Sequence, residues 1–197
     1  MSLPTTKTRE WHRDGFLLST DPSLIDRKAL NAAFDEDYMP WATPLSGEEL
    51  KVMVENSVCF GLYSATFEPA DTLSPTTSLS GADTQETAQP EDLEDSRPGQ
   101  IGMARLITDY ATVAYLTDVY ILPEYQGRGL GKWLIACVKE WWESMPNGRR
   151  LIFIASEGQG EDFYGKALGS KRLEDENSKD AGKKYRLFSA KGRGARV

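Results

Sequence analysis

The sequence has 197 residues, of which 40 % are hydrophobic and 10 % aromatic, so the chain can bury one sizeable core but hardly two. Its formal net charge of −7 arises in residues 64–99, which hold eight acids and one base. A neutral body with one acidic segment lacks the basic face that a general nucleic-acid binder needs to displace counterions from phosphates. We therefore expect one domain over residues 1–197 and no nucleic-acid partner.

The sequence contains no run of about 18 apolar residues, which a membrane span requires, and its N-terminus lacks the apolar core of a signal peptide. We expect a cytoplasmic protein, with the nucleus as the alternative, and no membrane partner. Ligands for a metal site are scarce, because the chain has one histidine, His12, and two cysteines, Cys59 and Cys137. We expect no metal, and we expect both cysteines to be small buried side chains without a disulfide.

The first quarter of the chain predicts a strand at residues 16–19 and then two helices. Asp21 is suited to the N-cap of the first helix, with Pro22 at its first position. Ser46 and Glu49 have the spacing of a capping box, which predicts the start of the second helix. The two helices are thus joined by the loop "DEDYMPWATP", which carries three acids and two aromatic side chains.

Three strands are predicted next, at residues 57–65, 99–110 and 113–122, and each should pair with the one that follows it. The segment between the first two, at about residues 64–99, is rich in Ser, Thr, Pro and acids. Such a segment buries too little apolar surface to offset its ordering entropy. We therefore expect it to be a flexible acidic insertion in a hairpin.

The second half of the chain alternates between helices and strands. A helix with one apolar face, a buried strand at residues 151–155, a short helix at 161–169 and a last strand at 183–190 are predicted in turn. The apolar face of the first of these helices is formed by Leu130, Leu134, Ile135, Val138, Trp141 and Trp142. Together the elements predict an α/β fold, with a mixed, mostly antiparallel central sheet flanked by helices.

A glycine-rich stretch, "QGRGLG" at residues 126–131, lies between a predicted strand and a predicted helix. Free N–H groups at a helix N-terminus bind anions, and Arg128 and Lys132 add positive charge. A dinucleotide fingerprint would need glycine where Lys132 stands, and a P-loop would need Ser or Thr where Trp133 stands. Neither of these phosphate loops fits, so a different anion-binding loop or a plain tight turn remains.

The spacing Gln126-x-x-Gly129-x-Gly131 resembles the pyrophosphate loop of the GNAT superfamily, the acyl-CoA-dependent N-acetyltransferases. The resemblance extends to the preceding strand and Pro-Glu-Tyr turn, and to "DFYGKALG", which is similar to the second signature of that family. It covers roughly residues 11–190. The family's fold has splayed central strands, and we expect the same splay here.

The resemblance implies that acetyl-CoA is the cosubstrate, with its pantetheine arm in the gap between the splayed strands and its pyrophosphate on the glycine loop. Polar backbone groups along the gap need partners, and one of those amides could polarise the thioester carbonyl, an effect of about 3 kcal/mol. The implied coenzyme contacts are Val119, Tyr120, Ile121, Gln126, Gly127, Arg128, Gly129, Leu130, Gly131 and Lys132.

Two side chains are candidates for proton transfer. Tyr164 matches the family tyrosine that protonates the departing thiolate, although an aromatic residue there could instead fill the core. Asp118 interrupts a nearly continuous apolar strand, a placement that favours a catalytic base. Its alternative role is structural, with the carboxylate accepting a hydrogen bond from a neighbouring backbone N–H or from Tyr110.

For the acceptor, acids beside the aromatic side chains Tyr38 and Trp41 would suit a cationic amine, with Tyr115 as a further wall. An acidic loop could equally be a solvated one, and Tyr115 could be core. We expect an N-acetyltransferase that acts on a primary amine of a small molecule. The alternatives are a protein or peptide lysine acetyltransferase and a non-catalytic CoA-binding regulatory domain. An exposed C-terminal strand would suit a homodimer.

Overall fold

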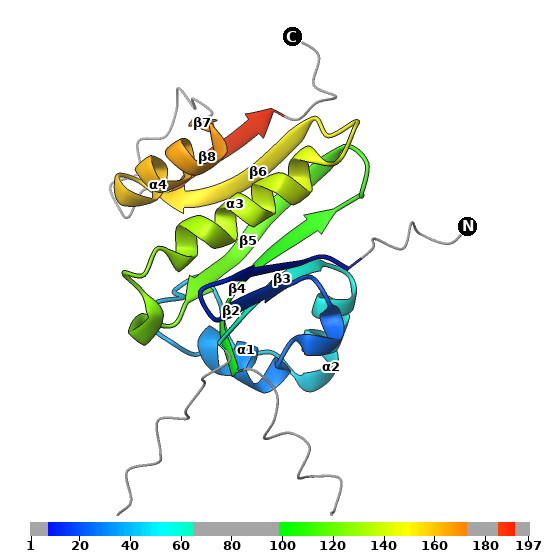
Figure 1. Cartoon of the computed structure of the whole chain (residues 1–197), viewed down its shortest axis with the longest axis vertical. Coiled ribbons are helices and arrows are strands. Elements are labelled where there is room, and N and C mark those ends of the chain that lie inside the picture. Colours follow the sequence, from blue (N-terminus) through cyan, green and yellow to red (C-terminus); the bar gives the residue numbers. More distant parts are fainter. Residues whose placement is uncertain (1–7, 65–98, 173–184, 192–197) are drawn as a thin grey trace, which may run out of the picture.

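The computed structural model describes residues 8–64, 99–172 and 185–191, and within them eight strands form one sheet in the order β1-β2-β3-β4-β5-β6-β8-β7 (Figure 1). The strands are β1 Glu10–Arg13, β2 Phe16–Ser19, β3 Val58–Ser64, β4 Gly99–Thr108, β5 Val113–Ile121, β6 Arg150–Ser156, β7 Lys171–Arg172 and β8 Tyr185–Lys191. The helices are α1 Arg27–Phe34, α2 Gly47–Glu55, α3 Leu130–Glu143 and α4 Gln159–Leu168, with 3₁₀ helices η1 Pro22–Leu24 and η3 Pro123–Tyr125.

The sheet is mixed and mostly antiparallel, as predicted. Neighbouring strands run antiparallel except β5 and β6, which are parallel. These two strands pair from Val113 with Arg150 to Leu116 with Phe153 and then part, although both continue further. The predicted splay of the central strands is therefore present, and it opens a gap in the middle of the sheet.

Apolar side chains cover both faces of the sheet, because successive residues of a strand point to opposite sides. Phe60 of β3 belongs to a core that includes the buried face of α3, whereas the adjacent Cys59 belongs to a second core with α1 and α2. In Figure 1, α3 runs across the viewed face of the sheet, and α1 and α2 lie together at one end of the molecule. Cys59 and Cys137 are both buried and free, as expected.

Helix α3 carries the predicted apolar face, and all six of its predicted core residues are buried. Helix α2 begins with the predicted capping box, in which the Ser46 and Glu49 side chains bond to each other's backbone N–H. The first predicted helix differs, because Asp21 caps only the short η1 helix. The main helix α1 begins after Asp26. The carboxylate of Asp26 accepts hydrogen bonds from two backbone N–H groups, whereas that of Asp21 accepts one, so Asp26 is the more complete N-cap.

The predicted acidic insertion at about 64–99 lies, apart from its two ends, outside the described residues. Its ends are adjacent, because Ser64 of β3 pairs with Gly99 of β4. Among the described helices, none is long and apolar enough to cross a membrane.

Two buried tyrosines should respond in opposite ways to loss of the hydroxyl. The Tyr63 hydroxyl is buried without a hydrogen-bond partner in the described part of the chain, whereas the Tyr120 hydroxyl accepts a bond from Gln100 Nε2 at 3.0 Å. We expect Tyr63→Phe to raise the free energy of unfolding by about 1 kcal/mol, and Tyr120→Phe to lower it by about 1 kcal/mol. Urea denaturation of the two variants measures both values. A loss of stability in Tyr63→Phe would show that its hydroxyl is hydrogen-bonded.

Candidate active site

The glycine loop leads from the end of β5 into α3, and its backbone needs glycine at two positions. Gly127 and Gly129 both have φ of 76°, in the left-handed region that side chains disfavour. Gly129 is the N-cap of α3, so no side-chain oxygen caps the first turn of that helix. Added Cβ atoms would meet nothing within 4 Å at Gly127, and at Gly129 only Arg13 at an ordinary contact of 3.6 Å. The loop therefore presents open backbone N–H groups at a helix N-terminus.

Side chains inside the loop hold its shape. The Gln126 amide donates to the Ile121 carbonyl at 2.9 Å, which ties the loop to the last residue of β5. The Arg128 guanidinium lies 5.2 Å from the centre of the Tyr125 ring and donates to the Glu124 carbonyl at 3.4 Å. Both side chains therefore also position the loop.

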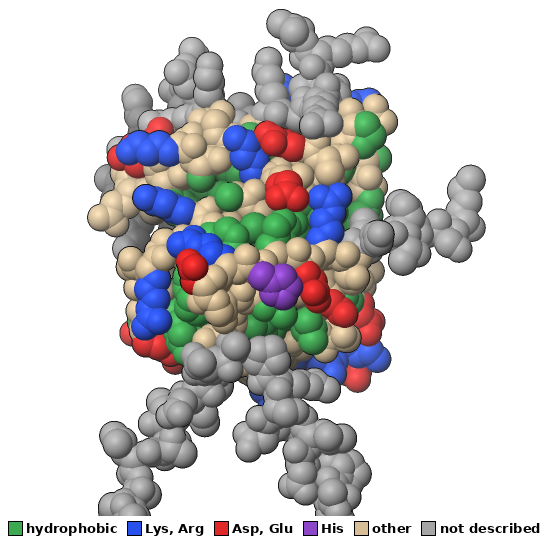
Figure 2. All heavy atoms as spheres, viewed as in Figure 1, with side chains coloured by type: hydrophobic (Ala, Val, Ile, Leu, Met, Phe, Trp, Pro, Cys, Tyr) green, Lys and Arg blue, Asp and Glu red, His purple; other side chains and the backbone are tan. Residues whose placement is uncertain are grey.

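Arg13 on β1 is a loop contact that the sequence reasoning missed. Its guanidinium donates to the carbonyls of Gly129 at 3.4 Å and Arg128 at 3.5 Å, across more than a hundred residues of sequence. The strand β1 was not predicted, but Asp14-Gly15 directly after it is a strong hairpin signal that could have placed Arg13 at a hairpin end. Figure 2 shows Lys and Arg side chains over the N-terminal end of α3, where the glycine loop lies.

Two cavities lie along the gap between β5 and β6. The smaller, of about 550 Å³, is lined by the glycine loop, the end of β5 and Phe163. The larger, of about 930 Å³, is lined by the middle of β5, the end of β6 and the loop after α1. Three residues line both cavities: Tyr38, Val119 and Tyr164. The two cavities therefore meet at these side chains.

The structure gathers the predicted site residues around these two cavities. Of the ten predicted coenzyme contacts, nine line the smaller cavity, and the exception is Arg128. The predicted catalytic and acceptor residues, Tyr38, Trp41, Tyr115, Asp118 and Tyr164, all line the larger cavity. Residues from distant parts of the sequence thus meet as the pattern predicted, although their roles stay predictions.

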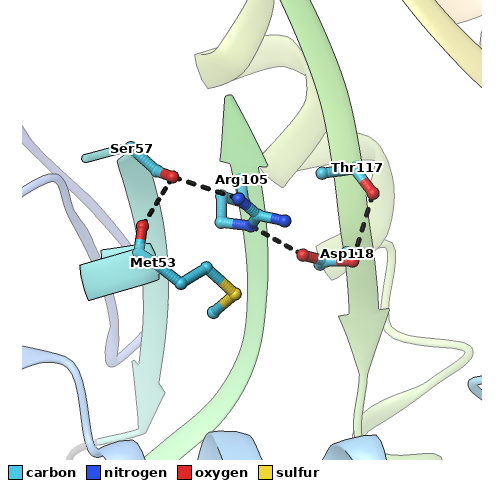
Figure 3. A network of polar contacts seen from close by, with 5 residues as sticks. All are labelled: Met53, Ser57, Arg105, Thr117 and Asp118. Atoms are coloured by element: carbon cyan, nitrogen blue, oxygen red, sulfur yellow. Dashed lines mark hydrogen bonds and ion pairs between the residues drawn. The ribbon is translucent and has the colours of Figure 1, made fainter. Parts of the chain in front are cut away.

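Asp118 is held by contacts with two other side chains (Figure 3). Its carboxylate pairs with Arg105 Nε at 2.6 Å and accepts a bond from the Thr117 hydroxyl at 3.1 Å. Arg105 in turn donates to the Ser57 hydroxyl at 3.1 Å, and Ser57 donates to the Met53 carbonyl at 2.7 Å. The charged partner of Asp118 is therefore Arg105, so the charge of the carboxylate is offset within the protein.

Asp118 also occupies an unusual backbone position. Its φ is 49°, in the left-handed region, and the register of β4 with β5 shifts there, from Met103 opposite Tyr120 to Arg105 opposite Thr117. One extra residue on β5 is the mark of a β-bulge, which bends a strand and redirects side chains beside active sites. The ion pair with Arg105 thus stabilises a strained point in the wall of the cavity.

Tyr164 is brought to the junction of the cavities by α4. Gly160 allows this approach, because a Cβ there would lie 2.8 Å from the Ser156 hydroxyl oxygen on β6. The Tyr164 ring lies 4.8 Å from the Phe153 ring, centre to centre. Burial raises the pKa of Tyr164 to about 12, so the hydroxyl keeps its proton at neutral pH and can donate it.

Comparison with known proteins is consistent with this geometry. The model of the family described as "Acetyltransferase (GNAT) family" matches residues 83–169. The Gibberella zeae protein named "Putative acetyltransferase FG08082" is 36 % identical over 166 residues, covering 84 % of this chain and 85 % of that protein. The Arabidopsis thaliana "GCN5-related N-acetyltransferase 2, chloroplastic" is 43 % identical over 87 residues, 44 % of this chain and 32 % of that protein. A GNAT-family crystal structure from Xanthomonas campestris matches with a TM-score of 0.54 at 28 % identity, covering 78 % of this chain and 85 % of that one.

A splayed sheet with a glycine loop at the N-terminus of the next helix is the architecture of an acyl-transferring enzyme of this type. The chain belongs to the GNAT family of acetyltransferases.

Proposed function

We propose that this protein transfers the acetyl group of acetyl-CoA to a primary amine of a small molecule. The observation that carries the proposal is the meeting of the two cavities at Tyr164 and Val119. One cavity has the features of a phosphate-binding loop, and the other has an apolar wall with acids. A reaction that joins a nucleotide-bearing donor to an amine acceptor needs these two sites in contact.

The residues around the smaller cavity fit the donor. The pyrophosphate would lie on the open N–H groups of residues 127–132, with the positive charge of Arg13 and Lys132 nearby. The pantetheine arm would bond the edge of β5 beyond Leu116, where pairing with β6 has ended. One of the same backbone N–H groups would polarise the carbonyl that is attacked.

Starting from an ammonium group, two protons leave the nitrogen, one before the attack on the carbonyl and one after it; one proton reaches the thiolate and the other passes to solvent. The amine nitrogen bonds to the acetyl carbon, the carbon–sulfur bond breaks, and the proposed proton donor to sulfur is Tyr164. An alkylammonium with a pKa of about 10.4 costs roughly 4.6 kcal/mol to deprotonate at pH 7. Asp118 is the proposed acceptor of this proton, and because it already accepts bonds from Arg105 and Thr117, transfer through water fits the same arrangement.

Isothermal titration calorimetry with acetyl-CoA tests the donor site. We expect the wild type to bind, and Gly129→Trp to lose detectable binding, because the indole would fill the smaller cavity beside the helix N-terminus. The matched control is Gly169→Trp at the end of α4, which has φ of 64° and no neighbour within 4 Å of an added Cβ. Its backbone strain is similar, but it lines neither cavity. Equal binding of acetyl-CoA by the two variants would contradict the proposed site. If the wild type did not bind acetyl-CoA, the proposal that it is the donor would be wrong.

A further inference from the structure

Aromatic side chains from several elements contribute to the walls of the larger cavity. Five aromatic side chains line it: Tyr38, Trp41, Tyr115, Phe153 and Tyr164. Its volume of about 930 Å³ is near the upper end of the range for small-molecule sites. The pantetheine arm, where it follows β5 beyond Leu116, would take part of this space, but a simple alkylamine would still leave most of these rings without contact. The acceptor therefore has a substantial body attached to its amine.

Two apolar side chains at this cavity are exposed to solvent. Trp41 and Ile154 are each 53 % exposed, which makes them two of the large hydrophobic residues left uncovered in the described part of the chain. They lie on different elements, the loop after α1 and the strand β6, yet they line the same cavity. Because both exposed side chains line the same cavity, they favour a ligand with an apolar surface.

The loop that carries the rings of Tyr38 and Trp41 is held in place. Met39 is fully buried between them, and its backbone N–H donates to Glu36 while its carbonyl accepts from Ala42. Beyond the loop, both groups of the Asn31 amide bond to the backbone of Leu45, at 3.0 and 2.8 Å. The aromatic wall is therefore formed before a ligand arrives, which reduces the entropy lost on binding.

The charges at the cavity favour a single cation on an apolar body. Among the described residues that line it, three are acids and none is Lys, Arg or His. The charge of Asp118 is offset by Arg105 at 2.6 Å. The others, Asp37 and Glu157, are exposed to solvent, where ion pairs contribute little. A polyamine would depend on ion pairs to these exposed carboxylates, which contribute little, so most of the affinity here has to come from apolar contact.

From these observations we infer that the acceptor is an arylalkylamine, a primary amine on a short chain that ends in an aromatic ring. The ring lies against Trp41 and Tyr115, and the amine lies at the junction beside Tyr164. This inference rests on the proposed function, because it names the substrate class of the same acceptor cavity.

Initial rates of thiol release from acetyl-CoA test the inference with four amines: 2-phenylethylamine, ethylamine, putrescine and a lysine-containing peptide. We expect kcat/KM for 2-phenylethylamine to exceed that for ethylamine by about 10- to 100-fold, because one ring is buried. Putrescine and the peptide should be no better than ethylamine. We expect Trp41→Ala to lower kcat/KM for 2-phenylethylamine by roughly 3- to 10-fold and to lower kcat/KM for ethylamine by a smaller factor, because ethylamine carries no ring to lie against the indole.

The control is Val52→Ala on α2, which also removes an exposed hydrophobic side chain, 56 % exposed against 53 % for Trp41. This variant should leave kcat/KM unchanged for both 2-phenylethylamine and ethylamine, because Val52 lines neither cavity. Two outcomes would overturn the inference and leave the donor site standing. In both, the protein binds acetyl-CoA, but it either prefers putrescine or the peptide or does not turn over 2-phenylethylamine. Failure of the wild type to bind acetyl-CoA would instead remove the proposed function and the inference together.

Discussion

Replacing Arg105 with methionine is expected to lower the free energy of unfolding by about 3–5 kcal/mol, because it leaves the Asp118 carboxylate buried without its partner. The side chains of Arg105 and Asp118 are 13 % and 7 % exposed, so water does not replace the lost ion pair. Methionine retains much of the length and packing of the arginine stem. Urea or guanidinium denaturation, with the midpoint and slope fitted together, gives the change.

A double variant separates the loss of the ion pair from loss of packing. Adding Asp118→Asn to Arg105→Met should restore most of the stability, because no buried charge remains and asparagine tolerates the left-handed backbone at this position. Arg150→Met is the matched control, since Arg150 is exposed, and its effect should be within about 0.5 kcal/mol. If Arg105→Met cost no more than Arg150→Met, the ion pair would not be what stabilises the bulge.

Replacing Tyr164 with phenylalanine is expected to lower kcat by about 100-fold or more with little change in KM for either substrate. The ring that contacts Phe153 is kept, and the hydroxyl that would protonate the thiolate is removed. Tyr110→Phe is the control, because Tyr110 is a partly buried tyrosine that packs on Trp141 and lines neither cavity. Steady-state kinetics with 2-phenylethylamine or another accepted amine measures the change. Wild-type kcat in the Tyr164 variant would assign proton donation to water.

The pH dependence of the wild type follows from the same side chain. An acid catalyst must carry its proton, so its contribution is present below its pKa and is lost as the pH rises through it. Since burial raises the pKa of Tyr164 to about 12, the hydroxyl is still protonated at about pH 10, where an exposed tyrosine would be half ionised. The pH–rate profile should therefore show no fall from Tyr164 up to about pH 10.

Features that depend on neighbouring residues were predictable from the sequence. The Ser46 and Glu49 capping box and the apolar face of α3 are set by spacing along a helix, and both are present as predicted. The glycine loop was predictable for the same reason. Gly127 and Gly129 adopt positive φ, and this backbone conformation favours glycine at those positions whatever lies elsewhere in the chain. Local rules were therefore enough to recognise the resemblance to the family and to place the loop that we propose as the donor site.

Contacts that depend on register between strands were not predictable. The sequence marked Asp118 as exceptional in an apolar strand, but its partner Arg105 is decided by a shift of one residue in the pairing of β4 with β5. Arg13 reaches the loop through a strand of four residues, too short to be recognised from its composition. At α1, the sequence predicted Asp21 as the N-cap, whereas Asp21 caps the short η1 helix and Asp26 caps α1.

The parting of β5 and β6 divides the sheet into two blocks that are joined by four residue pairs, with the first five strands on one side and the last three on the other (Figure 1). Few main-chain contacts therefore join the two blocks along this line. A donor lying in the gap as proposed would bond β5 along its length and contact β6 on the other side, and so would add interactions between the two blocks. A ligand that binds only the folded state stabilises that state by mass action. The free energy of unfolding of this enzyme would therefore increase with the concentration of its acetyl donor.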